Sequence, residues 1–308
     1  MAPQGLRRDA TTTVMKLRAP GDFNFWRTVY SHGWCSLPPF ACDEEKKELR
    51  IAVRLKDGTS VQCRLYDAGA DIAARIVPAL AGDQRQELAA MLRTCLRFDE
   101  DFSPFHAEAR RHPEYRWIAR SRAGRMLRAP TVFEDAVKMI CTTNCTWQLT
   151  TLMVSNIVAA AGAGTNGVRI FPDAGTLAMI PEQRLRKEIK AGYRSPFLHE
   201  LAARVAGGEL DIESWRTSTL PTDELFREIC SVKGIGPYAA GNLLKLIGRY
   251  DYLGLDSWVR SRYYALHRKG RRVKDATIER AYDHLGRWRG LFFWLEMTKE
   301  WHGDGTGS

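Results

Sequence analysis

Two short segments contain the residues whose types and spacing could do chemistry. The first, 232–241, reads VKGIGPYAAG, so Gly234 and Gly236 stand one residue apart and Pro237 follows directly. Apolar helices are expected on both sides, which makes the pattern helix, hairpin, helix. Glycines in such a turn allow another backbone to approach closely, and the unpaired N–H groups at the start of the second helix suit a phosphate oxygen. The alternative is an ordinary tight corner between two helices.

The second segment is LGLDSWVR, in which Asp256 stands eighteen residues after Tyr238 and directly before an expected helix. An Asp at this place caps the helix, because its carboxylate accepts N–H bonds from the next turn. The same geometry keeps the carboxylate ionised near the phosphate-binding hairpin. There it could stabilise positive charge on a sugar that is losing its base, and it could orient or deprotonate an attacking water. Capping and catalysis are compatible roles for Asp256.

The composition favours a polyanionic partner and excludes membrane-spanning and disordered chains. Of the 308 residues 44% are hydrophobic, and 46 Lys and Arg against 36 Asp and Glu give a formal net charge of +10. Such a charge suits a polyanion without selecting one. No apolar stretch approaches the roughly 20 residues of a membrane span. The N-terminus lacks the apolar core of a signal peptide, so we expect the protein to act in the compartment where it is made.

The seven cysteines predict reduced thiols of an intracellular protein. Their number is odd, and they are scattered without CxxC pairs or the tight four-Cys run that holds an iron–sulfur cluster. We therefore expect no iron–sulfur cluster and no required cofactor.

The apolar pattern predicts a small antiparallel sheet followed by helices. From about 14 to 67 the period is two, with Leu49, Ile51 and Val53 alternating with polar residues and turn chemistry at 56–59. After about 71 the period becomes helical, and AGAGTNG (161–167) is interpreted as a flexible crossing between lobes. The predicted class is α+β, mainly α, with an N-terminal antiparallel β domain and two helical lobes. The predicted divisions are 1–13 (flexible N-terminus), 14–80 (β domain), 81–165 (helical lobe, completed by 275–301), 166–274 (helical lobe with the hairpin and the Asp) and 302–308 (flexible tail).

The hairpin and the Asp together resemble the helix-hairpin-helix (HhH-GPD) DNA glycosylases, which carry a Gly/Pro-rich loop and an invariant Asp. The matching segments are VKGIGPYAAGNLL and LGLDSWVR. SHGWCSLPPF, MICTTNCTWQLT, AGYRSPFLHELA and LGRWRGLFFWLEMTKEW also appear in the order expected of the 8-oxoguanine and 3-methyladenine branches, which add an N-terminal β domain. The resemblance covers most of residues 23–301, and its specificity is concentrated in the hairpin and the Asp.

The resemblance implies roles for individual residues. Asp256 matches the catalytic carboxylate of the family. The DNA-binding hairpin is matched by Lys233, Gly234, Ile235 and Gly236. Lys233 replaces a Pro that is common at the start of this hairpin, a change that could add a phosphate contact.

Two further roles follow from the same resemblance. Backbone carbonyls of Cys230, Val232 and Ile235 match those that hold a structural monovalent cation, Na⁺ or K⁺, in some members. Asn144, in TTNCT, matches an Asn of the 8-oxoguanine branch that fills the gap left by the flipped base. The alternative for Asn144 is a turn residue that caps the helix starting near 146.

Tyr238 is the most informative departure from the family pattern. Bifunctional members place a Lys there, whose amine attacks the sugar carbon and forms a Schiff base, and a phenol cannot form that imine. Lys233 precedes the turn and Lys245 lies about two helical turns beyond, so neither replaces the amine in an obvious way. Tyr238 could instead stack against a base or a sugar.

The base pocket is harder to predict. By the resemblance, Phe293 stands where the 8-oxoguanine branch keeps a Gln that reads guanine, and Met297 stands where it keeps a stacking Phe. Losing both weakens an oxidised-guanine interpretation. Asn242, one turn after Tyr238, could face the same cavity. The alternatives are a core position for the residues of the last helix and a surface position for Asn242.

Basic residues after the Asp could extend the DNA track. Arg260 and Arg262 are the candidate phosphate contacts, although solvated basic faces are common on helices.

These observations predict a monofunctional DNA glycosylase of base excision repair. It would hydrolyse the N-glycosidic bond of a damaged base, with an alkylated purine expected, after the base is flipped out of duplex DNA. The expected partner is double-stranded DNA containing a lesion, with no membrane and a monomeric protein. The expected location is with DNA, in the nucleoid or cytoplasm of a bacterium or the nucleus of a eukaryote. The alternatives are an 8-oxoguanine glycosylase with lyase activity and a lesion-binding protein without catalysis.

Overall fold

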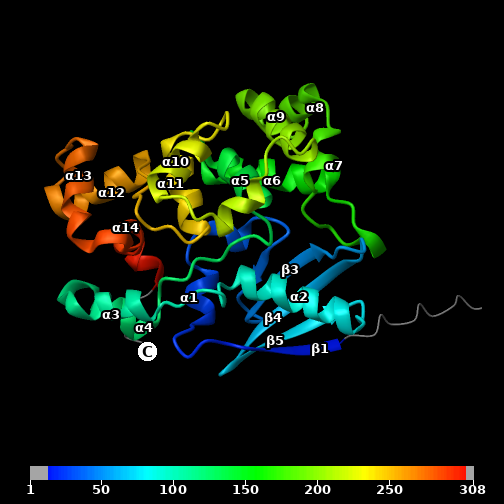
Figure 1. Ribbon diagram of the computed structural model, residues 1–308, viewed down its shortest axis with the longest axis horizontal. Helices are drawn as coiled ribbons and strands as arrows, with labels where there is room; N and C mark the ends of the chain where they lie inside the picture. Colours follow the sequence, from blue (N-terminus) through cyan, green and yellow to red (C-terminus); the bar gives the residue numbers. More distant parts are fainter. Residues whose placement is uncertain (1–12, 303–308) are drawn as a thin grey trace, which may run out of the picture.

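An antiparallel sheet of five strands lies at the N-terminal end of the chain (Figure 1). The computed structural model describes residues 13–302. Across the sheet the strand order is β1-β5-β4-β3-β2, and each pair of neighbours is antiparallel. The strands are β1 (Thr13–Arg18), β2 (Ala41–Asp43), β3 (Glu48–Arg54), β4 (Ser60–Ala68) and β5 (Asp71–Val77).

The alternation that predicted the sheet also sets its register. Ile51 and Val53 of β3 are buried and pair with Cys63 and Val61 of β4, which are buried as well. The turn between the two strands contains Gly58, whose φ of +87° is a left-handed conformation that favours glycine. The predicted hairpin at 56–59 is therefore confirmed.

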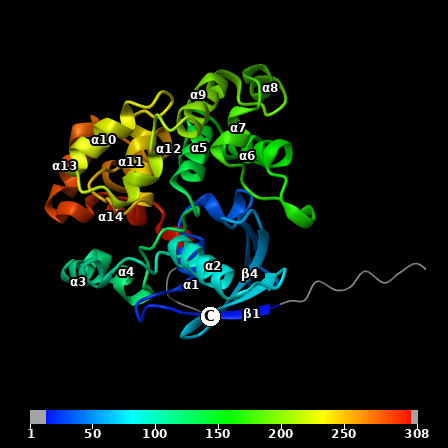
Figure 2. The same cartoon turned by 45° about the vertical axis from the view of Figure 1, so that its right-hand side comes forward.

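Helices form most of the remaining chain, with α5 between two groups. Figures 1 and 2 show α7, α8 and α9 on one side of α5, and α10 to α14 on the other. The predicted class, α+β and mainly α with an N-terminal antiparallel sheet, is confirmed. The domain bounds remain predictions. The helices are α1 (Phe25–Val29), α2 (Gly82–Cys95), α3 (Ser103–Arg111), α4 (Arg116–Ser121), α5 (Val132–Thr142), α6 (Trp147–Ala161), α7 (Ala174–Ala178), α8 (Glu182–Lys187), α9 (Ser195–Ala206), α10 (Thr222–Cys230), α11 (Pro237–Leu246), α12 (Ser257–Arg268), α13 (Asp275–Tyr282) and α14 (Arg289–Met297).

The crossing at 161–167 is anchored to the sheet, which corrects the expectation of a flexible linker. The Ser60 N–H donates to Thr165 Oγ1 at 2.9 Å, and the Thr165 N–H donates to Ser60 Oγ at 3.0 Å. A Cβ on Gly164 would lie 2.5 Å from Ser60 Oγ. Glycine is therefore required at this position by close packing of the crossing against β4, and not by mobility.

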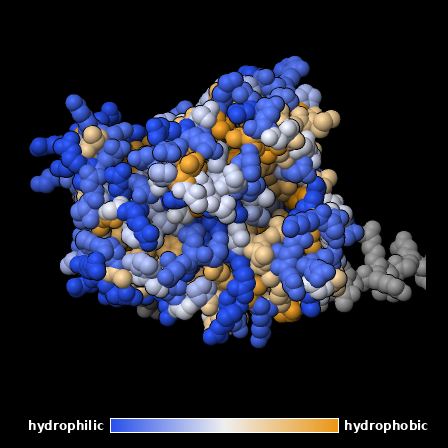
Figure 3. All heavy atoms as spheres, viewed as in Figure 1, coloured by the Kyte–Doolittle hydropathy of each residue, from blue (hydrophilic) through white to orange (hydrophobic). Residues whose placement is uncertain are grey.

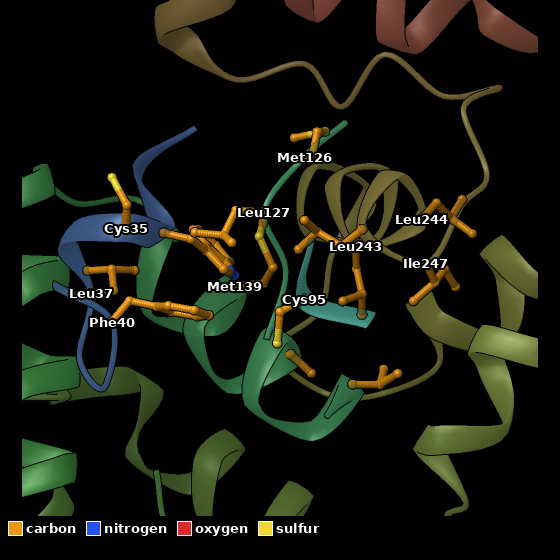
Figure 4. Close-up of a cluster of buried hydrophobic side chains, with 14 of the residues drawn as sticks. Cys35, Leu37, Phe40, Cys95, Met126, Leu127, Met139, Leu243, Leu244 and Ile247 are labelled. Atoms are coloured by element: carbon orange, nitrogen blue, oxygen red, sulfur yellow. The ribbon is translucent and has the colours of Figure 1, made fainter. Parts of the chain in front are cut away.

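A shared apolar core joins the N-terminal domain to the helical part. Figure 4 shows Leu37 and Phe40 from the N-terminal domain beside Met139 of α5, while Leu243 and Leu244 of α11 lie on the other side of the segment that carries Met126 and Leu127. All of these side chains are buried. This packing fixes α11, and with it the hairpin, relative to the N-terminal domain.

Candidate active site

The hairpin turn lies between α10 and α11, as predicted, and its two glycines have different roles. Gly234 has a φ of +89°, and a Cβ there would lie 2.7 Å from the Cβ of Phe197. Gly236 caps α11 with a φ of −84°, and a Cβ there would meet nothing within 4 Å. Gly234 is thus needed by the fold itself. Gly236 leaves open space in front of the first N–H groups of α11, where a phosphate could approach.

Asp256 is the N-cap of α12. Its Oδ1 accepts the N–H of Val259 at 2.7 Å, and its backbone is extended, as expected for a capping residue. The bond fixes the carboxylate at the start of the helix, where the positive end of the helix dipole favours negative charge. The predicted capping role is confirmed, and the carboxylate also lines the large cavity described next.

A cavity of about 820 Å³ opens between the N-terminal domain and the helices. This volume lies in the range of cavities that hold a small molecule. Tyr238, Asn242 and Asp256 meet in its wall, so the structure brings these three candidate residues together. The other lining residues are Tyr30, His32, Gly33, Trp34, Cys35, Glu44, Met126, Met139, Thr142, Cys145, Trp147, Thr150, Leu246, Trp258, Trp294 and Trp301.

Tryptophans form much of the cavity wall. Trp258, two residues after the catalytic candidate, has its ring centroid 5.3 Å from that of Trp301, which lies 5.8 Å from that of Trp294. On the opposite segment Trp147 packs on Gly33 so closely that a Cβ at Gly33 would lie 2.2 Å from the indole ring. These indoles offer flat electron-rich faces on which a planar base can stack.

The side chains that line the cavity are neutral or negatively charged. The lining residues in the described part of the chain include no Lys or Arg, and they include the carboxylates of Asp256 and Glu44. Burial lowers the pKa of His32 to about 3, so its imidazole is neutral at physiological pH. A cationic ligand would therefore meet aromatic faces and carboxylates without a like charge.

Tyr238 lines the cavity. Burial, and secondly the nearby charge of Asp256, raises the pKa of Tyr238 to about 12, so the phenol stays protonated. Asn242 donates from Nδ2 to the Tyr238 carbonyl at 3.0 Å, which orients its amide in the wall.

Phe293 and Met297 do not line this cavity, which corrects the expectation from the resemblance. Both side chains are buried in the core, and Phe293 packs edge-on against Tyr282 with ring centroids 5.1 Å apart. The physical reason is helical spacing: residues four apart share a face of α14, and that face is buried. Trp294, on the neighbouring face, reaches the cavity and donates from Nε1 to the Ser31 carbonyl at 2.9 Å.

Each of the three candidate phosphate contacts forms an ion pair with a carboxylate of the same chain. Lys233 Nζ lies 2.9 Å from Glu200 Oε2, and Arg260 forms a bidentate pair with Asp275 at 2.8 Å. Arg262 is paired with Glu300. At each basic side chain a phosphate would compete with a carboxylate of the protein.

Asn144 lies in the turn between α5 and α6 with a φ of +45°, a left-handed conformation that Asn tolerates better than most residues. Its Nδ2 is 3.4 Å from the hydroxyl of Tyr193, whose side chain is 48% exposed. The guanidinium of Arg194 lies over the Tyr193 ring at 4.4 Å. An exposed aromatic side chain beside the candidate gap-filling Asn was not predicted, because exposure cannot be read from AGYRSPFL alone.

The candidate cation site consists of carbonyls in the hairpin turn. The Val232 carbonyl accepts the Ile235 N–H at 3.0 Å and keeps a second lone pair, while the Cys230 and Ile235 carbonyls flank the same turn. Carbonyl oxygens are ligands for hard cations, and a monovalent cation at this turn stays a prediction. Within residues 13–302, no cluster of three or more His, Cys, Asp or Glu side chains could hold a metal ion. The seven cysteines are free.

Known proteins resemble this chain in structure. No protein-family model matches the sequence, and no curated protein sequence matches it. The structure is similar to that of 3-methyladenine DNA glycosylase from Archaeoglobus fulgidus, with a TM-score of 0.72 and 18% identity over 93% of this chain and 98% of that one. The chain has the fold of this DNA glycosylase.

Two other solved structures support the same assignment of fold. One is MBOgg1 in complex with a low-affinity DNA ligand, with a TM-score of 0.71 and 19% identity over 96% of this chain and 99% of that one. The other is the 8-oxoguanine glycosylase/lyase of Clostridium acetobutylicum, with a TM-score of 0.62 and 20% identity over 80% of this chain and 87% of that one. Both branches named from the sequence are therefore represented among the structures with this fold.

Proposed function

We propose that the protein is a DNA glycosylase that hydrolyses the N-glycosidic bond of a damaged base flipped out of duplex DNA. The observation that carries the proposal is the position of Asp256, whose helix-capping carboxylate lines an aromatic cavity a short distance along the chain from a phosphate-binding hairpin. Loss of a base leaves positive charge on the sugar, and a fixed carboxylate stabilises that charge and orients the attacking water. The shared fold with enzymes that are named DNA glycosylases supports this reaction.

The proposed substrate is an alkylated purine that carries a positive charge. Indole faces attract a cation, and each such contact is worth about 0.5–2 kcal/mol. The walls contain Trp147, Trp258 and Trp294, together with the carboxylate of Glu44 and the neutral imidazole of His32. A neutral base would lack the cation–aromatic attraction, although unstacking it from the duplex still costs free energy.

A panel of lesions tests the substrate directly. Duplex oligonucleotides that each contain one alkylated purine, 8-oxoguanine, uracil, mismatched thymine or hypoxanthine are incubated with the protein, and the released bases are measured by chromatography. We expect the alkylated purine to be released at least about tenfold faster than hypoxanthine, its neutral control. Preferred release of 8-oxoguanine would contradict the proposed substrate and leave the proposed reaction intact. Release of no base from any duplex would contradict the reaction.

One observation favours the alternative of a glycosylase with lyase activity. Burial lowers the pKa of Lys245 to about 7, although Asp256 opposes the shift, and a lysine that is neutral near physiological pH can act as a nucleophile. Its side chain, however, has no exposed surface, and its Nζ is held by three acceptors. We therefore retain the monofunctional proposal.

Substitution of the two hairpin glycines should have different effects, one on DNA binding and the other on stability. Gly236→Ala should leave the fold intact, because open space surrounds the new Cβ, and should weaken binding to damaged and undamaged duplex alike by about tenfold, by hindering phosphate approach. Gly234→Ala should instead lower the melting temperature, because its φ is +89° and its Cβ would clash with Phe197. Fluorescence anisotropy and thermal unfolding measure the two effects. Normal binding of undamaged DNA by Gly236→Ala, with failure only on the lesion, would place the hairpin in the base pocket.

The remaining properties follow from the proposed reaction. Hydrolysis that uses a carboxylate and water requires no cofactor, and we propose a monomer whose partner is double-stranded DNA with a lesion, in whichever compartment holds the DNA. In residues 13–302, none of the helices combines the length and the apolar character that a membrane crossing would need.

A further inference from the structure

Lys245 is a buried lysine in an apolar stretch of α11. Its side chain is 0% exposed, and the flanking Leu244 and Leu246 are buried as well. Nζ donates to the carbonyl of Leu253 at 2.8 Å, to Oδ1 of Asn242 at 3.2 Å and to the carbonyl of Gly241 at 3.3 Å. An ammonium group has three N–H donors, and here each of them has one acceptor.

Burying an ammonium group without a carboxylate directly bonded to it is unfavourable. The acceptors of Lys245 are two carbonyls and an amide oxygen, whereas the other fully buried lysine, Lys138, lies 2.6 Å from Glu134. Desolvation of a charge costs several kcal/mol even in a relaxed protein. A methionine would fill the same space without this cost, so the charge of Lys245 calls for a role outside packing.

The acceptor at Leu253 belongs to the loop that carries Asp256. This loop lies directly on α11: a Cβ on Gly241 would be 3.1 Å from the Cα of Gly254, and Asn242 Nδ2 is 3.4 Å from the Gly254 carbonyl. Gly254 has a φ of +67°, which favours glycine and turns the chain towards α12. The loop is thus attached to α11 at consecutive residues, and the ammonium group makes the shortest of these hydrogen bonds.

We propose that Lys245 is a positioning residue for the reaction, whose buried ammonium group holds the 253–256 loop on α11 and so places the Asp256 carboxylate and the Asn242 amide in the cavity wall. The inference rests on the proposed glycosylase function. Misplacement of a catalytic group by about 1 Å can cost about 100-fold in rate, so a tether of this kind has a measurable kinetic effect.

Only the protonated form of Lys245 has an N–H donor for each of its three acceptors. Burial lowers the pKa of Lys245 to about 7, and Asp256 opposes the shift. Of the other groups around it, Arg97 donates to the Lys245 carbonyl at 2.9 Å and stays charged because nearby carboxylates raise its pKa. The pKa values of His32 and Tyr238, about 3 and about 12, lie far from neutrality. The tether should therefore weaken as the pH rises through about 7.

Single-turnover base release by Lys245→Met and Lys245→Gln tests the proposal. We expect the rate at pH 6.5 to fall about 10- to 100-fold in both variants, with DNA affinity within about threefold of the native protein. The native rate should decline above about pH 7, and this alkaline limb should be absent in both variants. The thiol of Cys35 also lines the cavity, and its hydrogen bond to Cys42 lowers its pKa, so its ionisation is a second source of pH dependence. Cys35→Ser is the control for this source, and it should keep the decline of the rate above about pH 7.

Two readouts do not depend on catalysis. Hydrogen exchange at 253–259 should accelerate in the Lys245 variants and stay unchanged in the double variant Lys138→Met with Glu134→Gln, which removes a buried lysine on α5 together with the charge of its partner. The melting temperature of the native protein relative to Lys245→Met should also rise with pH. Between about pH 7 and about pH 10.4, the unfolded chain keeps the proton of Lys245 and the folded chain has lost it. Stability rises with pH wherever the unfolded state binds more protons, so the native protein gains stability over Lys245→Met in this range.

The outcomes separate failure of the inference from failure of the proposed function. If the native protein releases no base from any duplex, the glycosylase proposal fails, and hydrogen exchange alone decides whether Lys245 holds the loop. If base release proceeds and the Lys245 variants keep the native rate and pH profile, the positioning role is wrong. A borohydride-trapped DNA adduct that disappears in Lys245→Met would make this lysine the nucleophile and overturn the role proposed here. If Lys245→Met fails to fold, Lys245→Gln and the native pH profile still decide.

Discussion

Asp256→Asn should reduce base release by about 1,000-fold or more while leaving DNA affinity nearly unchanged. The amide oxygen of Asn can still accept the Val259 N–H that the native carboxylate accepts at 2.7 Å, so the start of α12 is preserved. What is lost is the negative charge that faces the developing positive charge on the sugar. Single-turnover release and anisotropy binding, measured on the same duplex, separate the two effects.

A second capping aspartate provides the matched control. Asp173 caps α7, where its Oδ1 accepts the Thr176 N–H at 2.7 Å, the same bond and distance as at Asp256. Asp173→Asn should therefore have a similar effect on stability and little effect on base release. If Asp256→Asn retained near-normal release, or if both variants lost activity equally, the catalytic assignment would be wrong and Asp256 would serve only as a cap.

The local part of this site could be predicted from the sequence because its causes are local. The GxG spacing sets the hairpin turn, an Asp before an apolar helix sets the cap, and Tyr238 and Asn242 are brought to one wall by the pitch of a single helix. The sheet was predictable for the same reason, since Val61, Cys63 and Leu65 alternate with polar residues along one strand. Each of these inferences needs only neighbours within a few residues.

The remaining walls could not be predicted because distant segments make them. Gly33 and Trp147 are more than a hundred residues apart, and only the folded chain shows that the indole packs on the glycine backbone. On α14 the sequence is aromatic at successive positions, so it gives no sign that Trp294 reaches the cavity while Phe293 is buried. Lys245 is similar: its significance depends on the Leu253 carbonyl, which only the loop geometry brings to Nζ.

The basic side chains show a further limit of inference from charge. The sequence places Arg260 and Arg262 near the catalytic segment, and both are paired with carboxylates, Asp275 and Glu300, in the structure. In Figure 3 the surface around α12 and α13 is mostly hydrophilic. Exposed ion pairs of this type are worth at most about 1 kcal/mol, so a phosphate could displace a carboxylate at small cost. Their role in DNA binding stays a prediction.

The product of the reaction is predicted to be an intact strand with an abasic site. Strand cleavage by β-elimination needs an amine that forms an iminium with the opened sugar, and the sequence resemblance implies that Tyr238 stands in the place of that amine. Among the nearby lysines, Lys233 is paired with Glu200 on an exposed part of the hairpin, and Lys245 is fully buried. Neither amine faces the cavity wall that holds Asp256, so water is the expected nucleophile.

Borohydride trapping gives the decisive measurement on a lesion that the protein excises. We expect no covalent protein–DNA adduct, and we expect strand breaks only after treatment with hot alkali, because the abasic sugar is released from the enzyme intact. A known bifunctional glycosylase on its own substrate shows that the trapping conditions work. An adduct that is lost in Lys233→Met or Lys245→Met would show that a lysine attacks the sugar. In that case the lowered pKa of Lys245, about 7, would supply the neutral amine that the chemistry requires. Without an adduct, water oriented by Asp256 remains the nucleophile, and Tyr238 serves as part of the cavity wall beside that carboxylate.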